Sequence, residues 1–248
     1  MPSLNLPDGP REGALLVFDK DGVLADFHRA WGAMVRARVD ALTRLSGLAD
    51  LVEALKAGFG VDTAWRPLPQ GLLATGSRTQ AIAVAAACLE AVGVPEARAI
   101  AETAFAQADA AVSMADRHAA LPGAGDTLRH LAQSGWRLAI ASTDTTSGIR
   151  EFLAHNRLDG LAIACVGSDR VARGKPAPEM FRLACGESGV GPHAAAMIGD
   201  GLVDLQMGRA AGAFATIGVL GGVGTHEMLA PHADWLVPDV TALVPPSV

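Results

Sequence analysis

The stretch ALLVFDKDGVL, residues 14–24, decides the fold of this chain. Residues 14–18 form a short and uninterrupted apolar run, which is typical of a strand buried on both faces of a parallel sheet. The run stops at Asp19-Lys20-Asp21-Gly22, so polar groups are expected where the strand leaves the sheet. Because Asp19 and Asp21 are two residues apart, an extended chain directs both to the same side and turns Lys20 away from them.

Similar apolar runs recur later in the chain, and helical patterns separate them. This strand–helix alternation predicts an open, Rossmann-like parallel sheet with helices on both faces, which is an α/β fold. The expected strands are 137–141, 161–166, 194–198, 213–217 and 234–237, and the expected helices are 124–133, 146–155, 178–188 and 202–211.

A long segment between the first two strands interrupts this alternation. It lacks a convincing strand pattern and is interpreted as helices over about 28–45, 47–58, 77–92 and 96–115. A segment of this length is too long to be a single crossover connection. We therefore predict an inserted, all-helical cap domain at 27–118 and an α/β core domain formed by 1–26 and 119–248.

Composition narrows the class of protein. The 248 residues are 50% hydrophobic and carry a formal net charge of −6, which disfavours a general nucleic-acid binder with a basic stripe. Cys88, Cys165 and Cys185 are widely spaced, so we expect reduced thiols. No signal peptide is expected, and the longest apolar run, 81–89, is too short to span a bilayer. These features predict a cytoplasmic enzyme without a nucleic-acid or membrane partner, and they leave the oligomeric state open.

Polar residues follow several of the predicted strands at the point where each strand ends. Ligands of open α/β sheets bind outside the carboxyl ends of the strands, so these side chains should share one edge of the sheet. The residues gathered there are Asp19, Asp21, Ser142, Thr143, Asp144, Lys175, Asp200 and Asp204.

This set of residue types indicates phosphate chemistry. Several carboxylates without a thiol or a histidine cluster suit a hard cation such as Mg2+. A bound cation neutralises an anionic phosphate and lets a carboxylate approach it. Lys175 and Ser142 are suited to phosphate oxygens, and Gly22 permits a tight turn whose amide N–H groups can point at an anion. Each piece alone is common in turns, loops and helix caps, so the prediction depends on their combination.

Four segments resemble the motifs of the haloacid dehalogenase-like hydrolase superfamily. The likeness extends from about residue 14 to about residue 240 and implies an Mg2+-dependent phosphatase that forms an aspartyl-phosphate intermediate. The four segments are DKDGVL (19–24), IAST (140–143), GKPAPEMF (174–181) and IGDGLVDLQMGRAAG (198–212).

The resemblance also implies a role for each matching residue. Asp19 is the expected nucleophile, Asp21 the general acid and base, and Lys175 the partner of the nucleophile and the phosphate. Phosphate binding is expected from Ser142, Thr143, Gly22 and Lys175, and metal binding from Asp19, Asp21 through its backbone carbonyl, Asp200 and Asp204. Two positions depart from the family pattern: Val23 stands where Thr is commoner, and Lys20 stands where the family is apolar or variable.

Within the family, Asp21 favours phosphate-ester chemistry over dehalogenation, because an alkoxide leaving group needs an acid. The position of the helical insert resembles the phosphoglycolate phosphatase branch, so 2-phosphoglycolate is the candidate substrate, with Arg66 and Arg78 as candidate substrate contacts. The alternative is a phosphomutase of the β-phosphoglucomutase type, which shares the DGV sequence and a first cap helix like that of His28 and Trp31. A receiver-type signalling module is disfavoured, since its first-strand acids are adjacent in sequence.

Overall fold

The computed structural model describes residues 1–75 and 77–244. These residues form two compact units, one built from 1–26 and 118–244 and the other from the described residues between 27 and 117. Gly76, which falls in the predicted helical insert, lies outside the described residues.

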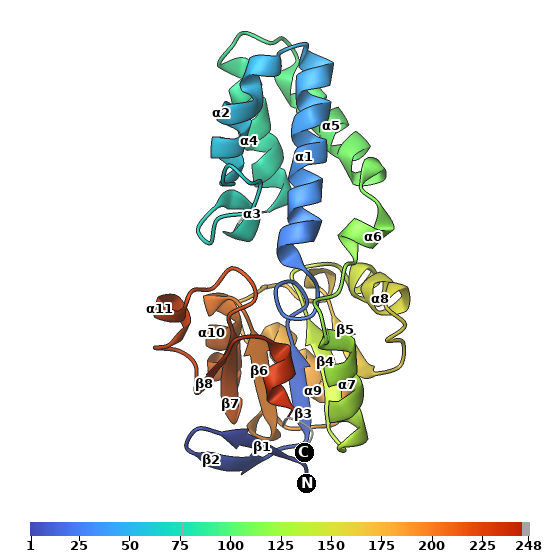
Figure 1. The fold of residues 1–248 in the computed structure, drawn as a ribbon, viewed down its shortest axis with the longest axis vertical. Coiled ribbons are helices and arrows are strands. Elements are labelled where there is room, and N and C mark those ends of the chain that lie inside the picture. Colours follow the sequence, from blue (N-terminus) through green and yellow to red (C-terminus); the bar gives the residue numbers. More distant parts are fainter. Residues whose placement is uncertain (76, 245–248) are drawn as a thin grey trace. The chain divides into compact units, whose positions relative to one another are not determined.

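The first unit is built around a six-stranded sheet in which every neighbouring pair is parallel. The spatial order is β5-β4-β3-β6-β7-β8, so the connections reverse direction at β3 (Figure 1). Ligands of open α/β sheets bind at such a switch point. The predicted α/β sheet is confirmed, and its strands are β3 (Leu15–Phe18), β4 (Arg137–Ala141), β5 (Ala162–Val166), β6 (Ala195–Gly199), β7 (Ala215–Val219) and β8 (Trp235–Val237).

Helices cover both faces of this sheet because alternate strand residues point to opposite sides. One face packs against α7 (Ala124–Gln133), α8 (Thr146–His155) and the 3-10 helix η4 (Val240–Leu243). The other face packs against α9 (Glu179–Glu187) and α10 (Leu202–Ala211). Short elements complete the unit: the 3-10 helices η2 (Ser168–Arg170) and η3 (Pro192–Ala194), and α11 (His226–Leu229).

A tight turn follows β3 and ends its extended geometry. The Lys20 carbonyl accepts hydrogen bonds from the amides of Leu24 and Ala25 at 2.9 and 2.8 Å. Gly22 has a φ of 78°, a left-handed conformation that glycine adopts without steric cost. Its amide donates to the Ala25 carbonyl at 2.9 Å, so this amide is engaged inside the turn.

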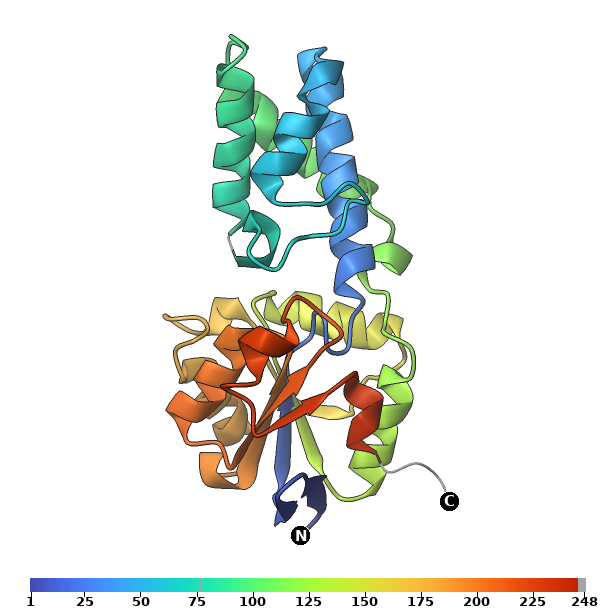
Figure 2. The ribbon, with the colours of Figure 1, turned by 60° about the vertical axis from the view of Figure 1, so that its left-hand side comes forward.

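The second unit is all-helical, as predicted, and Figures 1 and 2 show its longer helices side by side. Its core includes Phe59 and Phe105, whose ring centroids are 6.0 Å apart. The helix expected at 47–58 begins as a 3-10 turn and continues as an α-helix, and a short break divides the helix expected at 96–115. The elements are α1 (Phe27–Ser46), η1 (Ala49–Leu51), α2 (Val52–Phe59), α3 (Leu72–Thr75), α4 (Arg78–Glu90), α5 (Ala97–Ala111) and α6 (Met114–Arg117).

An N-terminal hairpin was not part of the sequence prediction. It pairs β1 (Ser3–Leu6) with β2 (Gly9–Glu12) in antiparallel register. Leu4 and Leu6 alternate with exposed residues and join the core on one face of the six-stranded sheet. Across the described residues, no helix combines the length and apolarity that a membrane span needs.

Candidate active site

Lys175 is the positive centre of the acid cluster at the carboxyl edge of the sheet. Its Nζ atom lies 2.6 Å from Asp19 Oδ1 and 2.6 Å from Asp204 Oδ1. Burial alone lowers the pKa of Lys175, but the two carboxylates outweigh it and hold the pKa above its ordinary value. The ammonium therefore stays charged and bridges residues that follow two different strands.

Asp19 is positioned by a strand-type hydrogen bond that continues the pairing beyond the last residue of β3. Its amide donates to the Ile198 carbonyl of the neighbouring strand β6 at 2.8 Å. Burial raises the pKa of Asp19, Lys175 opposes that rise and Asp204 adds to it, with a net increase. The side chain of this predicted nucleophile is thus enclosed and held beside a permanent positive charge.

Asp200 follows β6 and is 3% exposed. Burial raises the pKa of Asp200 well above its ordinary value, and the charges of Asp19 and Asp204 raise it further. The Val223 amide donates to Asp200 Oδ2 at 2.7 Å. A Cβ atom at Gly22 or Gly222 would collide with this carboxylate, so both glycines leave the room that Asp200 occupies.

Three of the acids have the composition of a hard-cation site. Asp19, Asp200 and Asp204 each offer an oxygen, and these oxygens lie within 4.8 Å of one another. All three residues are buried, and burying several carboxylates together is costly unless a cation neutralises them. Oxygen-only donors of this kind fit Mg2+ better than zinc. Asp204 also accepts from the Gly201 amide at 3.0 Å, which fixes it in the first turn of α10.

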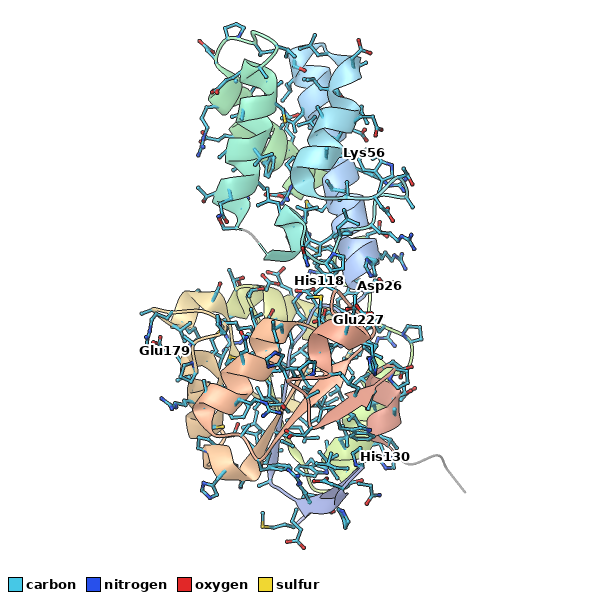
Figure 3. All side chains as sticks on the ribbon, turned by 90° about the vertical axis from the view of Figure 1, so that its left-hand side faces the viewer. Asp26, Lys56, His118, His130, Glu179 and Glu227 are labelled. Carbon is cyan, nitrogen blue, oxygen red and sulfur yellow. The ribbon has the colours of Figure 1, made fainter. Side chains whose placement is uncertain are left out.

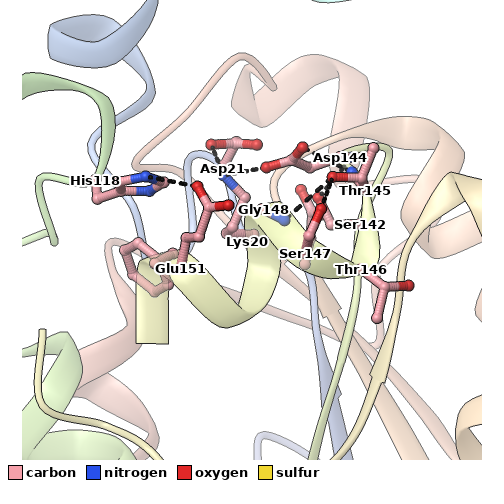
Figure 4. A network of polar contacts seen from close by, with 12 residues as sticks. Lys20, Asp21, His118, Ser142, Asp144, Thr145, Thr146, Ser147, Gly148 and Glu151 are labelled. Carbon is pink, nitrogen blue, oxygen red and sulfur yellow. Dashed lines mark hydrogen bonds and ion pairs between the residues drawn. The ribbon is translucent and has the colours of Figure 1, made fainter. Parts of the chain in front are cut away.

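The predicted orientation of Lys20 is wrong. Its side chain does not turn away from the acids, because the chain leaves the extended conformation at the turn that follows Asp19. Lys20 Nζ lies 2.9 Å from Asp21 Oδ1 and 3.3 Å from Asp144 Oδ2 (Figure 4). Burial lowers the pKa of Lys20, but Asp21 and Asp144 outweigh this effect and raise it. Burial also raises the pKa of Asp21, and Lys20 opposes that rise.

The loop after β4 supplies the predicted hydroxyl groups. Ser142 is fully buried, and its Oγ accepts from the Asp144 amide at 3.2 Å. Thr143 is exposed beside it. Ser142 thus lies at the same strand edge as the acids, whereas the amide of Gly22 is occupied by Ala25. The phosphate-binding role expected of Gly22 stays a prediction.

Arg66 and Arg78, the candidate substrate contacts, both lie in the helical unit and both form ion pairs within it. Arg66 Nε is 2.9 Å from Asp62 Oδ2, and an Arg78 Nη atom is 2.6 Å from Asp109 Oδ2. Arg66 also lines a cavity of about 310 Å3 on this unit. The remaining lining residues are His28, Arg29, Gly32, Ala33, Arg36, Ala64, Trp65 and Asp116.

Sequence reasoning missed the contribution of the loop after β7. The Val223 amide donates to Asp200 Oδ2, and the absence of a side chain at Gly222 leaves room for the same carboxylate. Their specific roles carry no side-chain signal, because one acts through its backbone amide and the other through the lack of a side chain. Thr225 caps α11, and its side chain accepts from the Met228 amide.

Known proteins are similar to this chain in sequence and in fold. A family model described as haloacid dehalogenase-like hydrolase matches residues 14–212. The Dickeya dadantii (strain 3937) protein named "Probable phosphatase IndB" is 30% identical over 218 residues, which cover 87% of this chain and 84% of that protein. A phosphoglycolate phosphatase of Cereibacter sphaeroides (strain ATCC 17025 / ATH 2.4.3) is 33% identical over 91 residues, which cover 37% of this chain and 41% of that protein.

A solved structure shares the architecture at low sequence identity. The Thermotoga maritima protein described as "putative beta-phosphoglucomutase" superimposes with a TM-score of 0.69 and is 18% identical. The match covers 93% of this chain and 96% of that chain. Identity at this level shows a shared fold alone.

Proposed function

Because this chain belongs to the haloacid dehalogenase-like hydrolase family, we propose that it is an Mg2+-dependent phosphatase acting on a small phosphate monoester. The observation that carries the proposal is the buried group of Asp19, Asp200 and Asp204 with Lys175 bridging two of them. It combines a nucleophile, a cation site and a fixed positive charge at one strand edge. These are the parts that phosphoryl transfer needs, since positioning and charge neutralisation provide most of its catalysis.

The first half of the proposed reaction transfers the phosphoryl group to Asp19. A carboxylate oxygen of Asp19 forms a bond to phosphorus, and the bond between phosphorus and the ester oxygen breaks. Asp21 donates its proton to the departing oxygen, so the product leaves as a neutral alcohol. Lys175 and the Ser142 hydroxyl hold the phosphoryl oxygens during the transfer.

The second half returns Asp19 to its starting state. Asp21, now a carboxylate, takes a proton from water as the water oxygen bonds to phosphorus. The bond between phosphorus and Asp19 then breaks, which releases inorganic phosphate and regenerates both acids. Asp21 can serve both halves because its side chain is 20% exposed at the edge of the site.

Asp19, Asp200 and Asp204 would hold Mg2+, together with the backbone carbonyl of Asp21. When bound, the ion neutralises charge on the phosphoryl oxygens and lowers the repulsion that the Asp19 carboxylate meets. Its fit is supported by the close spacing and burial of the three carboxylates.

We further propose that the helical unit is a cap that selects the ester and that 2-phosphoglycolate is the substrate. The likeness to a phosphoglycolate phosphatase supports this choice. The cavity on the helical unit adds support, because Arg36 and Arg66 line it and suit the carboxylate of such a substrate.

The test is a screen of small phosphate esters with the purified full chain, with Mg2+ present and with a chelator. We expect release of inorganic phosphate only with Mg2+, and with 2-phosphoglycolate among the best substrates. Asp19→Asn removes the nucleophile, and we expect phosphate release to fall by about 1,000-fold or more. Asp126→Asn, at a side chain that is 89% exposed, is the matched control and should remain active.

A different outcome would favour the alternative function. Interconversion of hexose 1- and 6-phosphates without net phosphate release would replace the phosphatase proposal with a phosphomutase. Unchanged phosphate release by Asp19→Asn would instead remove Asp19 from the mechanism.

A further inference from the structure

Lys20 is a buried cation at the site, and the proposed reaction assigns it no role. The chain has only three lysines, Lys20, Lys56 and Lys175, and two of them contact acids at this strand edge. Lys175 bridges Asp19 and Asp204. Lys20 bridges a second pair, Asp21 and Asp144, at 2.9 and 3.3 Å.

We propose that Lys20 is a positioning residue that holds the Asp21 carboxylate in place for proton transfer, with Asp144 as its anchor. The inference rests on the proposed function, because it assigns Asp21 the role of acid and base. It adds two residues, Lys20 and Asp144, to the parts of the chain on which the reaction depends.

The burial of the three side chains supports positioning over direct contact with a substrate. The Lys20 side chain is 5% exposed, whereas those of Asp21 and Asp144 are 20% and 34% exposed. The ring of Phe152 also lies near the ammonium, with its centroid 5.7 Å from Nζ. Lys20 is thus enclosed by its partners, whereas the carboxylates of Asp21 and Asp144 are both partly exposed.

The chemistry of lysine suits a bridge between two carboxylates. An ammonium group has three N–H donors around one small charge, so it can serve two acids at once. Without it, Asp21 would stand near the negative charges of both Asp19 and Asp144, which Coulomb repulsion disfavours. Removing Lys20 should therefore let the Asp21 side chain move away from its present position.

Asp144 is fixed independently of Lys20, which is what an anchor requires. Its Oδ1 accepts from the Thr145 amide at 2.6 Å. A Cβ atom on Gly148, in the first turn of α8, would collide with the Asp144 carboxylate, so this glycine leaves the space that Asp144 fills. Figure 4 shows Lys20 joined by dashed lines to both Asp21 and Asp144, so these ion pairs connect the turn after β3 to the loop after β4.

The experiment uses two esters of matched shape, phenyl phosphate and 4-nitrophenyl phosphate, with the Mg2+-loaded full chain. The value of kcat/KM covers the steps up to departure of the alcohol, and phenolate needs protonation more than 4-nitrophenolate does. We expect Lys20→Met to lower kcat/KM for phenyl phosphate about tenfold more than for 4-nitrophenyl phosphate. This tenfold difference is smaller than the full contribution of a general acid, because Asp21 itself remains present in the variant. An equal loss on both esters, or no loss, would overturn the inference.

Controls separate this effect from a simple loss of stability. Lys56→Met removes another buried lysine, one that lies in the helical unit (Figure 3), and should leave the ratio between the two esters unchanged. Asp144→Ala removes only the anchor and should shift the ratio in the same direction as Lys20→Met; an unchanged ratio would contradict the anchoring role.

A structural readout completes the test. In a crystal structure of Lys20→Met, we expect the Asp21 carboxylate to leave its wild-type position while Asp19 and Lys175 keep theirs. An undisturbed Asp21 would overturn the inference even if activity fell. Failure of the wild-type chain to release phosphate from these two esters, from 2-phosphoglycolate and from every other ester of the screen would overturn the proposed function instead, so the two failures are distinguishable.

Discussion

At the scale of single residues, Asp200 shows how the site lowers the stability of the protein. Its folded-state pKa lies well above the ordinary value because the carboxyl group is buried near Asp19 and Asp204. A raised acid pKa favours folding below the unfolded pKa, and this contribution is lost as the pH rises through the folded pKa. At neutral pH without metal, the Asp200 carboxyl group therefore opposes folding.

This cost predicts that Asp200→Asn stabilises the metal-free protein. In the presence of a chelator at pH 7, we expect Tm to rise by about 2 °C or more, the shift that roughly 1 kcal/mol produces in a chain of this size. The difference between variant and wild type should shrink as the pH is lowered toward the ordinary pKa of aspartate. Thermal unfolding with and without Mg2+ measures both effects.

The same variant should lose most of the stabilisation that added Mg2+ gives to the wild-type chain, because a ligand stabilises only the state that binds it. Asp126→Asn, on the exposed surface, should change neither the metal-free Tm nor the response to Mg2+. If Asp200→Asn keeps the same increase in Tm with Mg2+ as the wild-type chain, the ion must bind elsewhere.

Most acids of this site could be predicted from the sequence, while the orientation of Lys20 could not. The carboxyl ends of parallel strands share an edge, so Asp19 and Asp200 had to lie close together once their strands were identified. Lys20 follows no such rule, because its direction depends on the turn closed by two amides on its carbonyl and by the left-handed Gly22. A period-2 pattern holds only while the chain stays extended.

At the scale of elements, the N-terminal hairpin was missed although its sequence carries a signal. Leu4 and Leu6 alternate with polar residues, and Asp8-Gly9 follows, a pair that is common in hairpin turns. The stretch has only two apolar residues on its buried side. A short strand of this kind becomes stable through the core it packs against, which the local sequence does not reveal.

The burial of these leucines predicts a measurable role in stability. Leu4 is 2% exposed within the core cluster of the α/β unit, so Leu4→Ala should lower the free energy of unfolding by about 2–4 kcal/mol. Urea denaturation of the full chain measures this change. Asn5→Ala, at the exposed position between the two leucines, is the matched control and should change stability little. Equal effects of the two variants would show that the hairpin does not contribute through its buried side.

At the scale of the whole molecule, every residue assigned to the reaction lies in the α/β unit, whereas the residues assigned to ester selection lie in residues 27–117. The chain enters and leaves this insert at neighbouring points: the Asp26 amide donates to the Ala119 carbonyl at 2.8 Å. A short Gly/Ser linker can therefore replace 27–117 without stretching the core.

We expect the shortened protein to unfold cooperatively and to keep its Tm increase with Mg2+, while its kcat/KM values for different phosphate esters become similar. Circular dichroism, thermal unfolding and the ester screen test these expectations, with the intact chain as control. Loss of the Mg2+ response from a folded core would mean that the helical unit supplies part of the metal site, and undiminished discrimination between esters would mean that the core itself selects the substrate.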